Sequence, residues 1–243
     1  SLFFKFLVIG VVAAVFAVSN DYVKRFHRFQ AEYYALVLFS ATGMMLLAST
    51  TELITIYISL ELTALPLAAL AAFLRDGRSS ESGMKFLILS GMSSAILLYG
   101  MVLVYGFTGS TMLADVATRL GEIGLNDGQP FGSYALLLGI VLMIAGFGFK
   151  ITAVPFQMWA PDVYEGSPTP ITAFLSVASK AAGFAVILRI FYIAFPMDIL
   201  SIEWSAIFAA LAALSMTLGN LVAIPSATSS GCWRTAPWAT RDT

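Results

Sequence analysis

The sequence predicts an all-α protein that crosses a membrane about seven times, and three observations support this prediction. Apolar residues make up 59% of the 243 residues and charged residues only 11%, whereas soluble domains average about 45–50% and about 25%. The apolar residues gather in runs, and about 20 such residues cross the hydrocarbon core of a bilayer as a helix. The runs also lack the alternation of a barrel strand, so helices are the structure that satisfies their backbone in lipid.

Seven apolar runs qualify as membrane spans. In chain order they are Leu2–Val18, Tyr33–Ser49, Leu53–Phe73, Gly83–Phe107, Tyr134–Val154, Pro170–Phe195 and Trp204–Ile224. Loops 19–32 and 74–82 are rich in lysine and arginine, so the positive-inside rule predicts that they are cytoplasmic. Loops 108–132 and 196–203 are then outside, and the stretch "TMLADVATRLGEIG" in the first of them has the spacing of a helix that lies on the membrane surface.

Composition and motifs exclude several other classes of protein. The net charge is −1, so nothing indicates binding to nucleic acid. The single cysteine, Cys232, excludes an intrachain disulfide framework and a multi-cysteine metal site. The single histidine, His27, has no partner at the spacing of metal ligands. No nucleotide-binding motif occurs, so we expect no cofactor in this chain.

The sequence changes character at Pro225, where the polar stretch "PSATSSGCWRTAPWATRDT" begins. One interpretation is a disordered tail. The other is a frameshift, because codons can be chosen for this stretch that, one base out of phase, encode a basic segment beginning Q-R-N-I-K-R. A basic cytoplasmic loop is what the positive-inside rule expects here. We therefore predict a membrane domain over residues 1–224 and a frameshifted, non-native tail over 225–243.

Two ionisable residues lie in the third and fourth spans. Such residues cost roughly 2.5–3.5 kcal/mol at mid-helix on insertion scales, and they commonly mark an ion path. Glu61, in "TIYISLELTALPLAAL", is either part of such a path or one half of a structural ion pair. Lys85, in "ESGMKFLIL", either takes part in the path or extends its ammonium to the membrane surface. Because the two spans form a hairpin, a Glu61–Lys85 contact is feasible.

Lys150 precedes a predicted break in the fifth span. Pro155, in "GFGFKITAVPFQMWAPDVYEG", removes a backbone donor and clashes with the preceding turn. The residues after it are still apolar, so Tyr134 to about Ala160 is one long span with a break, which places Lys150 in the interior. Broken helices at membrane depth occur only against protein or a water-filled cavity. A buried lysine there can gain and lose a proton; the alternative is a packing kink with a lysine that reaches the surface.

Lys180 lies ten residues into the sixth span, among the small residues of "SVASKAAG". Small residues allow close helix packing and leave room for water. Lys85, Lys150 and Lys180 therefore join one carboxylate, Glu61, within the spans. A carboxylate contact holds a neighbouring lysine protonated, and loosening that contact releases the proton, which is the basis of an electrostatic switch.

Three stretches closely resemble a known family. They are "YISLELTALPLAALAAF", "SSESGMKFLILSGMSSAILLYGMVLVYGFTG" and "GFGFKITAVPFQMWAPDVYEGSPTPITAFLSVASKAAGFAVILRIF". The family is that of subunit N of bacterial NADH:quinone oxidoreductase, respiratory complex I, whose antiporter-like members are similar to Mrp-type cation/proton antiporters. The resemblance covers nearly all of residues 30–225.

The resemblance implies two inverted five-helix repeats, each with a broken helix, of which this sequence holds the first. It implies a proton path in which Glu61 is the buried glutamate and Lys85 its paired lysine. Lys150 is then the central lysine beside the break, and Lys180 the lysine of the following helix.

The family's activity couples electron transfer from NADH to quinone with proton pumping. The resemblance implies that this chain carries no redox centre and that NADH, FMN, iron–sulfur clusters and quinone are bound by other subunits. Its partners would be the lipid bilayer and other membrane-arm subunits, in the inner membrane of a bacterial cell. Two alternatives stay open: a subunit of a Mrp-type antiporter or membrane-bound hydrogenase, and a non-transporting scaffold or inert fragment.

Overall fold

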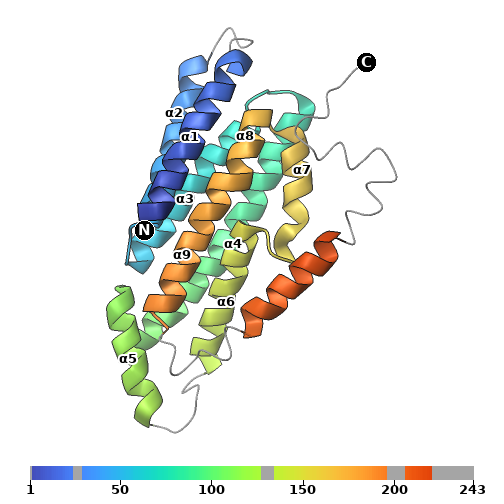
Figure 1. The fold of residues 1–243 in the computed structure, drawn as a ribbon. Helices are drawn as coiled ribbons and strands as arrows, with labels where there is room; N and C mark the ends of the chain where they lie inside the picture. The colour runs from blue at the N-terminus through green and yellow to red at the C-terminus, as the bar shows by residue number, and fades with distance from the viewer. Residues whose placement is uncertain (1, 24–28, 127–133, 196–205, 221–243) are drawn as a thin grey trace.

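The computed structural model describes residues 2–23, 29–126, 134–195 and 206–220, and this part of the chain is a bundle of helices (Figure 1). The helices are α1 (Leu2–Val23), α2 (Gln30–Leu47), α3 (Leu53–Ala71), α4 (Gly77–Thr108), α5 (Leu113–Asn126), α6 (Tyr134–Ile151), the 3₁₀ turn η1 (Phe156–Met158), α7 (Trp159–Gly166), α8 (Thr169–Phe174), the π-helical turn η2 (Leu175–Ser179), α9 (Lys180–Ile193) and a last helix, Ala206–Asn220.

Each of the seven expected spans coincides with a helix, which confirms the predicted fold class for the described residues. Five helical segments are long and apolar enough to cross a membrane. The α2 helix is not among them because it begins with polar residues, including Gln30 and Glu32, and Ala206–Asn220 is shorter. The predicted sidedness of the loops stays a prediction, and the predicted non-native tail, 225–243, lies outside the described residues.

The α4 helix packs against α3, α6 and α7. It begins at Gly77, six residues before the predicted start at Gly83, because Asp76 caps it: the Asp76 carboxylate accepts a 2.6 Å hydrogen bond from the Ser79 amide. Its 32 residues span about 48 Å, more than the hydrocarbon core of a bilayer. The helix therefore extends beyond the membrane at one or both ends.

Small residues bring the central helices into contact. A Cβ at Gly100 of α4 would lie 2.7 Å from the carbonyl oxygen of Gly139 in α6, and one at Gly43 of α2 would lie 2.6 Å from Thr63 Oγ1 in α3. Close approach through small residues is typical of membrane helices, because lipid gives apolar side chains no reason to associate. A hydrogen bond from Ser40 Oγ to the Thr63 carbonyl, 3.2 Å long, adds polar contact at the same α2–α3 interface.

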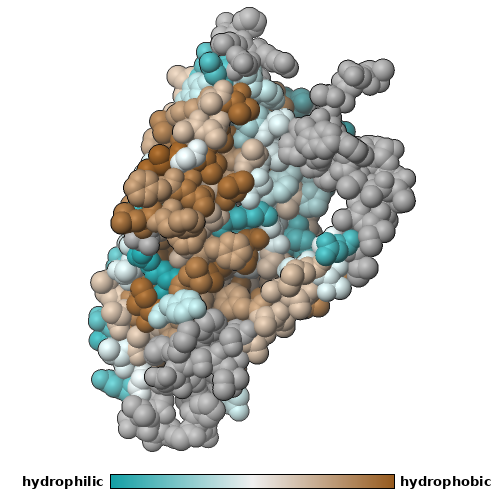
Figure 2. All heavy atoms as spheres, viewed as in Figure 1, coloured by the Kyte–Doolittle hydropathy of each residue, from teal (hydrophilic) through white to brown (hydrophobic). Residues whose placement is uncertain are grey.

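The outer surface of the bundle is apolar. Figure 2 shows apolar residues gathered over α1, on the face that it presents to the viewer. On this helix Leu2, Phe3, Phe6 and Val18 are each more than 60% exposed. Such a surface fits lipid, and large exposed apolar patches on soluble monomers are rare.

The predicted break near Pro155 is confirmed. The α6 helix ends at Ile151, and α7 resumes at Trp159 after a cis Val154–Pro155 peptide bond and the η1 turn. Figure 1 shows the break midway along the bundle. The freed backbone groups find other partners: the Ala153 amide donates to Gly148 O at 2.8 Å, and the Val154 amide donates to Ser215 Oγ at 2.9 Å.

A second irregularity, the π-helical turn η2, interrupts the sixth span and was not predicted. It lies directly before Lys180, between α8 and α9. Its five residues, "LSVAS", carry no proline or glycine that would have indicated it. Single π-helical turns inside helices are frequently found at functional sites.

Substitution of Gly100 tests the close approach of α4 and α6. Gly100→Leu would place side-chain atoms against Gly139 and Met143, whereas Gly91→Leu on the same helix meets nothing within 4 Å at its Cβ. Both variants gain the same helix propensity, so their difference isolates the packing, which overpacking weakens by about 1–3 kcal/mol. We expect Gly100→Leu to lower the unfolding temperature of the detergent-solubilised protein while Gly91→Leu does not. Equal unfolding temperatures would contradict this packing.

Candidate functional site

The predicted site residues come from four helices and only partly converge. Glu61 lies in the middle of α3, Lys85 in the first third of α4, Lys150 at the end of α6 and Lys180 at the start of α9. Lys150 and Lys180 both lie at the helix break that contains Pro155. Glu61 lies within electrostatic range of Lys150, whereas Lys85 lies elsewhere.

Lys150 lines a small cavity between α3, α4 and α6. The centre of a water molecule can move within about 20 Å³ of this cavity, which is room for about one water. Three serines of α4, Ser90, Ser93 and Ser94, contribute to its wall. Ser93 Oγ donates a 3.1 Å hydrogen bond to the carbonyl oxygen of Gly146, one turn before Lys150. The hydroxyls and the amine can bond a water in this space, and the rest of its wall, which includes Leu97 and Phe149, is apolar.

Glu61 is the carboxylate whose charge acts on Lys150. Its Oε1 atom is buried and has no hydrogen-bond partner among the described residues. A buried carboxylate oxygen without a partner is costly, so this atom is a place where water is expected.

Lys180 is held at the break by contacts from both sides of it. Its ammonium donates to the hydroxyl of Thr152, which follows α6, and lies 5.7 Å from the centre of the Tyr164 ring in α7. The start of α9 also approaches the end of α6 closely: a Cβ at Gly183 would lie 3.7 Å from Lys150 Cγ. The two lysines therefore occupy one junction.

Two further polar groups at the break were not singled out from the sequence. The Tyr164 hydroxyl and Gln157 Oε1 are buried and, among the described residues, have no hydrogen-bond partner. Both follow Pro155 in the stretch "FQMWAPDVYEG", where polar residues interrupt an apolar run. That interruption is the signal by which they could have been found.

Lys85 does not contact Glu61, so the feasible pair between them is not formed. Its ammonium lies 2.8 Å from Glu81 Oε1 on the same helix and 2.8 Å from Asp162 Oδ2 of α7, and its side chain is 42% exposed. The break turns α7 toward the first turns of α4 and brings Asp162 to Lys85. Asp162 was not predicted as this partner, because a hairpin brings together only the two spans that form it.

Lys85 belongs to a charged cluster at the start of α4. Arg78 and Glu165 form a second bridge between α4 and α7, 3.4 Å long, and the cluster surrounds a polar cavity of about 220 Å³. Ser82 Oγ donates a 3.0 Å hydrogen bond to the Val163 carbonyl beneath it. These contacts attach α7 to α4.

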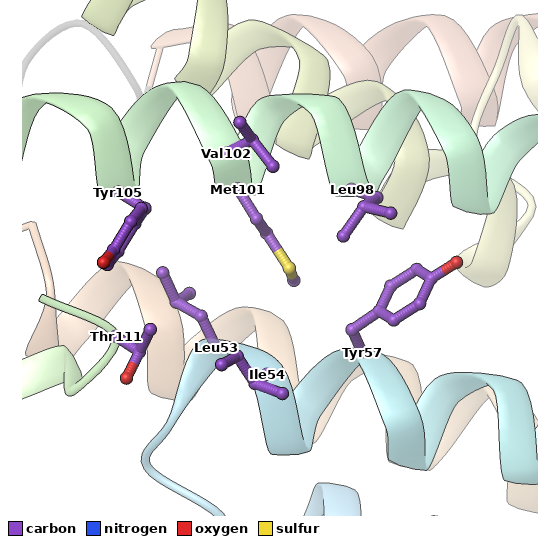
Figure 3. Close-up of a pocket in the computed structure, with 8 residues that line it drawn as sticks. All are labelled: Leu53, Ile54, Tyr57, Leu98, Met101, Val102, Tyr105 and Thr111. Carbon is purple, nitrogen blue, oxygen red and sulfur yellow. The ribbon is translucent and has the colours of Figure 1, made fainter.

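A larger apolar groove lies between α3 and α4 (Figure 3). Its volume is about 380 Å³, and its walls include Leu53, Tyr57, Met101 and Tyr105. No lysine, arginine, histidine or carboxylate lines it. The groove is therefore separate from the polar junction around Lys150.

The sequence matches known proteins over most of its length. Residues 50–227 match the family model described as "NADH:quinone oxidoreductase/Mrp antiporter, TM". The chain is 53% identical over 92% of its length to NADH-quinone oxidoreductase subunit N of Dehalococcoides mccartyi, and 48% identical over 93% to that of Heliobacterium modesticaldum. In both cases it covers 46% of the relative, so the chain spans about half the length of the curated relatives it matches.

Solved structures share the fold. Respiratory complex I from Thermus thermophilus contains a chain that is 34% identical, with a TM-score of 0.71 over 97% of this chain and 48% of that one. An archaeal membrane-bound sulfane sulfur reductase contains one that is 26% identical, with a TM-score of 0.75 over 97% of this chain and 47% of that one. The chain therefore belongs to the family of transmembrane subunits shared by NADH:quinone oxidoreductases and Mrp antiporters.

Proposed function

We propose that this chain forms the proton-translocating first half of subunit N in a bacterial NADH:quinone oxidoreductase of the inner membrane. The names of its relatives support the complex. One structural observation carries the proposed mechanism: Lys150 lies at a cavity lined by three serines beside a broken helix, within electrostatic range of Glu61. The neighbouring membrane-arm subunits are its partners, and NADH, FMN, iron–sulfur clusters and quinone are bound by other subunits.

The proposed path runs from Lys150 to Lys180 across the break. Glu61 holds the proton on Lys150 by electrostatic attraction. When that attraction weakens, the proton leaves Lys150 through water in the junction and is taken up by the neutral amine of Lys180. The polar atoms of Gln157 and Tyr164 that lack partners provide hydrogen-bonding sites for this water.

A second candidate function is that of a subunit in a related ion-translocating membrane complex. The archaeal sulfane sulfur reductase supports it, because its subunit has the same fold at 26% identity. The higher identity to subunit N, 53%, favours complex I. Proton uptake driven by NADH oxidation supports the first function, whereas cation exchange without electron transfer supports an antiporter.

Lys150→Ala tests the proposed path. In inverted membrane vesicles containing the assembled complex, we expect the rate of proton uptake during NADH oxidation to fall by about a hundredfold or more, because a positioned proton carrier contributes at least that factor. Dye fluorescence quenching measures the uptake. Lys5→Ala, at a lysine in α1 away from the junction, is the control and should pump normally. Normal pumping by Lys150→Ala would support a scaffold instead.

Lys85→Ala tests whether Lys85 belongs to the path or to the contact between α4 and α7. Because its partners are Glu81 and Asp162, we expect Lys85→Ala to slow proton uptake less than Glu61→Gln does, in the same vesicles. An exposed ion pair contributes only about 0.2–1 kcal/mol, so the complex should still assemble. A loss as large as that of Glu61→Gln would instead place Lys85 in the path, as the family resemblance implies.

A further inference from the structure

Thr152 has a backbone conformation that is unusual for its residue type. Its φ is 59°, in the left-handed region, which a β-branched residue rarely adopts. Such conformations persist where the surroundings impose them, and they cluster at functional sites. Thr152 is the first residue after α6, and it lies three residues before Pro155.

The hydroxyl of Thr152 has a defined role as an acceptor toward Lys180. It donates its single hydrogen to the Ile151 carbonyl at 2.6 Å, and Lys180 Nζ donates to it. A hydroxyl has one donor and two acceptor sites, so toward Lys180 it can only accept. Hydrogen bonds from a charged donor are roughly twice as strong as neutral ones. Thr152 therefore stabilises the protonated form of Lys180.

Other groups around Lys180 also help to position its ammonium. The Tyr164 ring of α7 lies 5.7 Å away, within the range of a cation–π interaction. The η2 turn ends at Ser179, so an irregular turn in one helix meets the break in another at this contact. Lys150 is the charged residue that approaches from α6, near Gly183.

We propose that Thr152 is a positioning residue that holds the protonated ammonium of Lys180 at the helix break. This inference rests on the proposed proton path. A proton that has crossed the break stays on Lys180 while the Thr152 contact lasts, and it moves on when that contact opens. Without the hydroxyl, Lys180 would retain its proton poorly and transfer would slow.

Three substitutions at Thr152 separate the hydroxyl from the backbone. Thr152→Ser keeps the hydroxyl, Thr152→Val keeps the β-branched shape without it, and Thr152→Gly removes both the hydroxyl and the steric cost of the left-handed backbone. In the vesicle assay we expect Thr152→Ser to pump normally, and the Val and Gly variants to slow proton uptake about tenfold, the effect of one charge-assisted hydrogen bond. Normal pumping by Thr152→Gly would overturn the proposal, because only the backbone would then matter.

A double variant distinguishes a failure of the proposed proton path from a failure of the proposed role of Thr152. Thr152→Val added to Lys180→Ala should slow uptake no further than Lys180→Ala alone, because residues that act through one contact are not additive. A further loss in the double variant would mean that Thr152 acts independently of Lys180. If Lys180→Ala itself pumps normally, the proposed path fails; if it pumps poorly while Thr152→Val pumps normally, only the role of Thr152 fails.

Discussion

The structure depends on the cost of placing charge inside a membrane. An ammonium or carboxylate at mid-span must be paired, hydrated or moved to the surface. Here the chain breaks its own helix after α6, and the break creates the polar junction that Lys150 and Lys180 share. The same break redirects α7 toward α4, where Lys85 bridges to Asp162. One backbone interruption therefore determines the surroundings of three lysines.

Close packing makes this arrangement possible. Glycines of α4 and α6 bring the two helices together at Gly100 and Gly139, while the serines of α4 border a water-sized cavity nearer the start of α4 in the same interface. Small apolar residues and small polar residues thus have different tasks along one helix. The glycines hold the bundle together without a hydrophobic driving force, and the serines border a water-sized space beside Lys150.

The sequence was sufficient for what depends on local chemistry. Hydropathy located the spans, and Pro155 located the break, because both depend on the residues themselves. The partner of Lys85 was not predictable, because Asp162 reaches α4 only through the direction that the chain takes after the break. We did not predict the π-helical turn before Lys180 or the left-handed backbone of Thr152 for a similar reason. Tertiary packing imposes both, and the stretches "LSVAS" and "KITAVP" contain no glycine that would have indicated them.

Proton transfer across the break requires water at the junction. An electron cryomicroscopy map of the assembled complex that resolves ordered water would test this requirement most directly. We predict water density in the cavity lined by Ser90, Ser93 and Lys150, and a water bound to Glu61 Oε1. A dry cavity, with Glu61 and Lys150 each bonded to other protein groups, would contradict it. Proton transfer from Lys150 across the break would then have no medium.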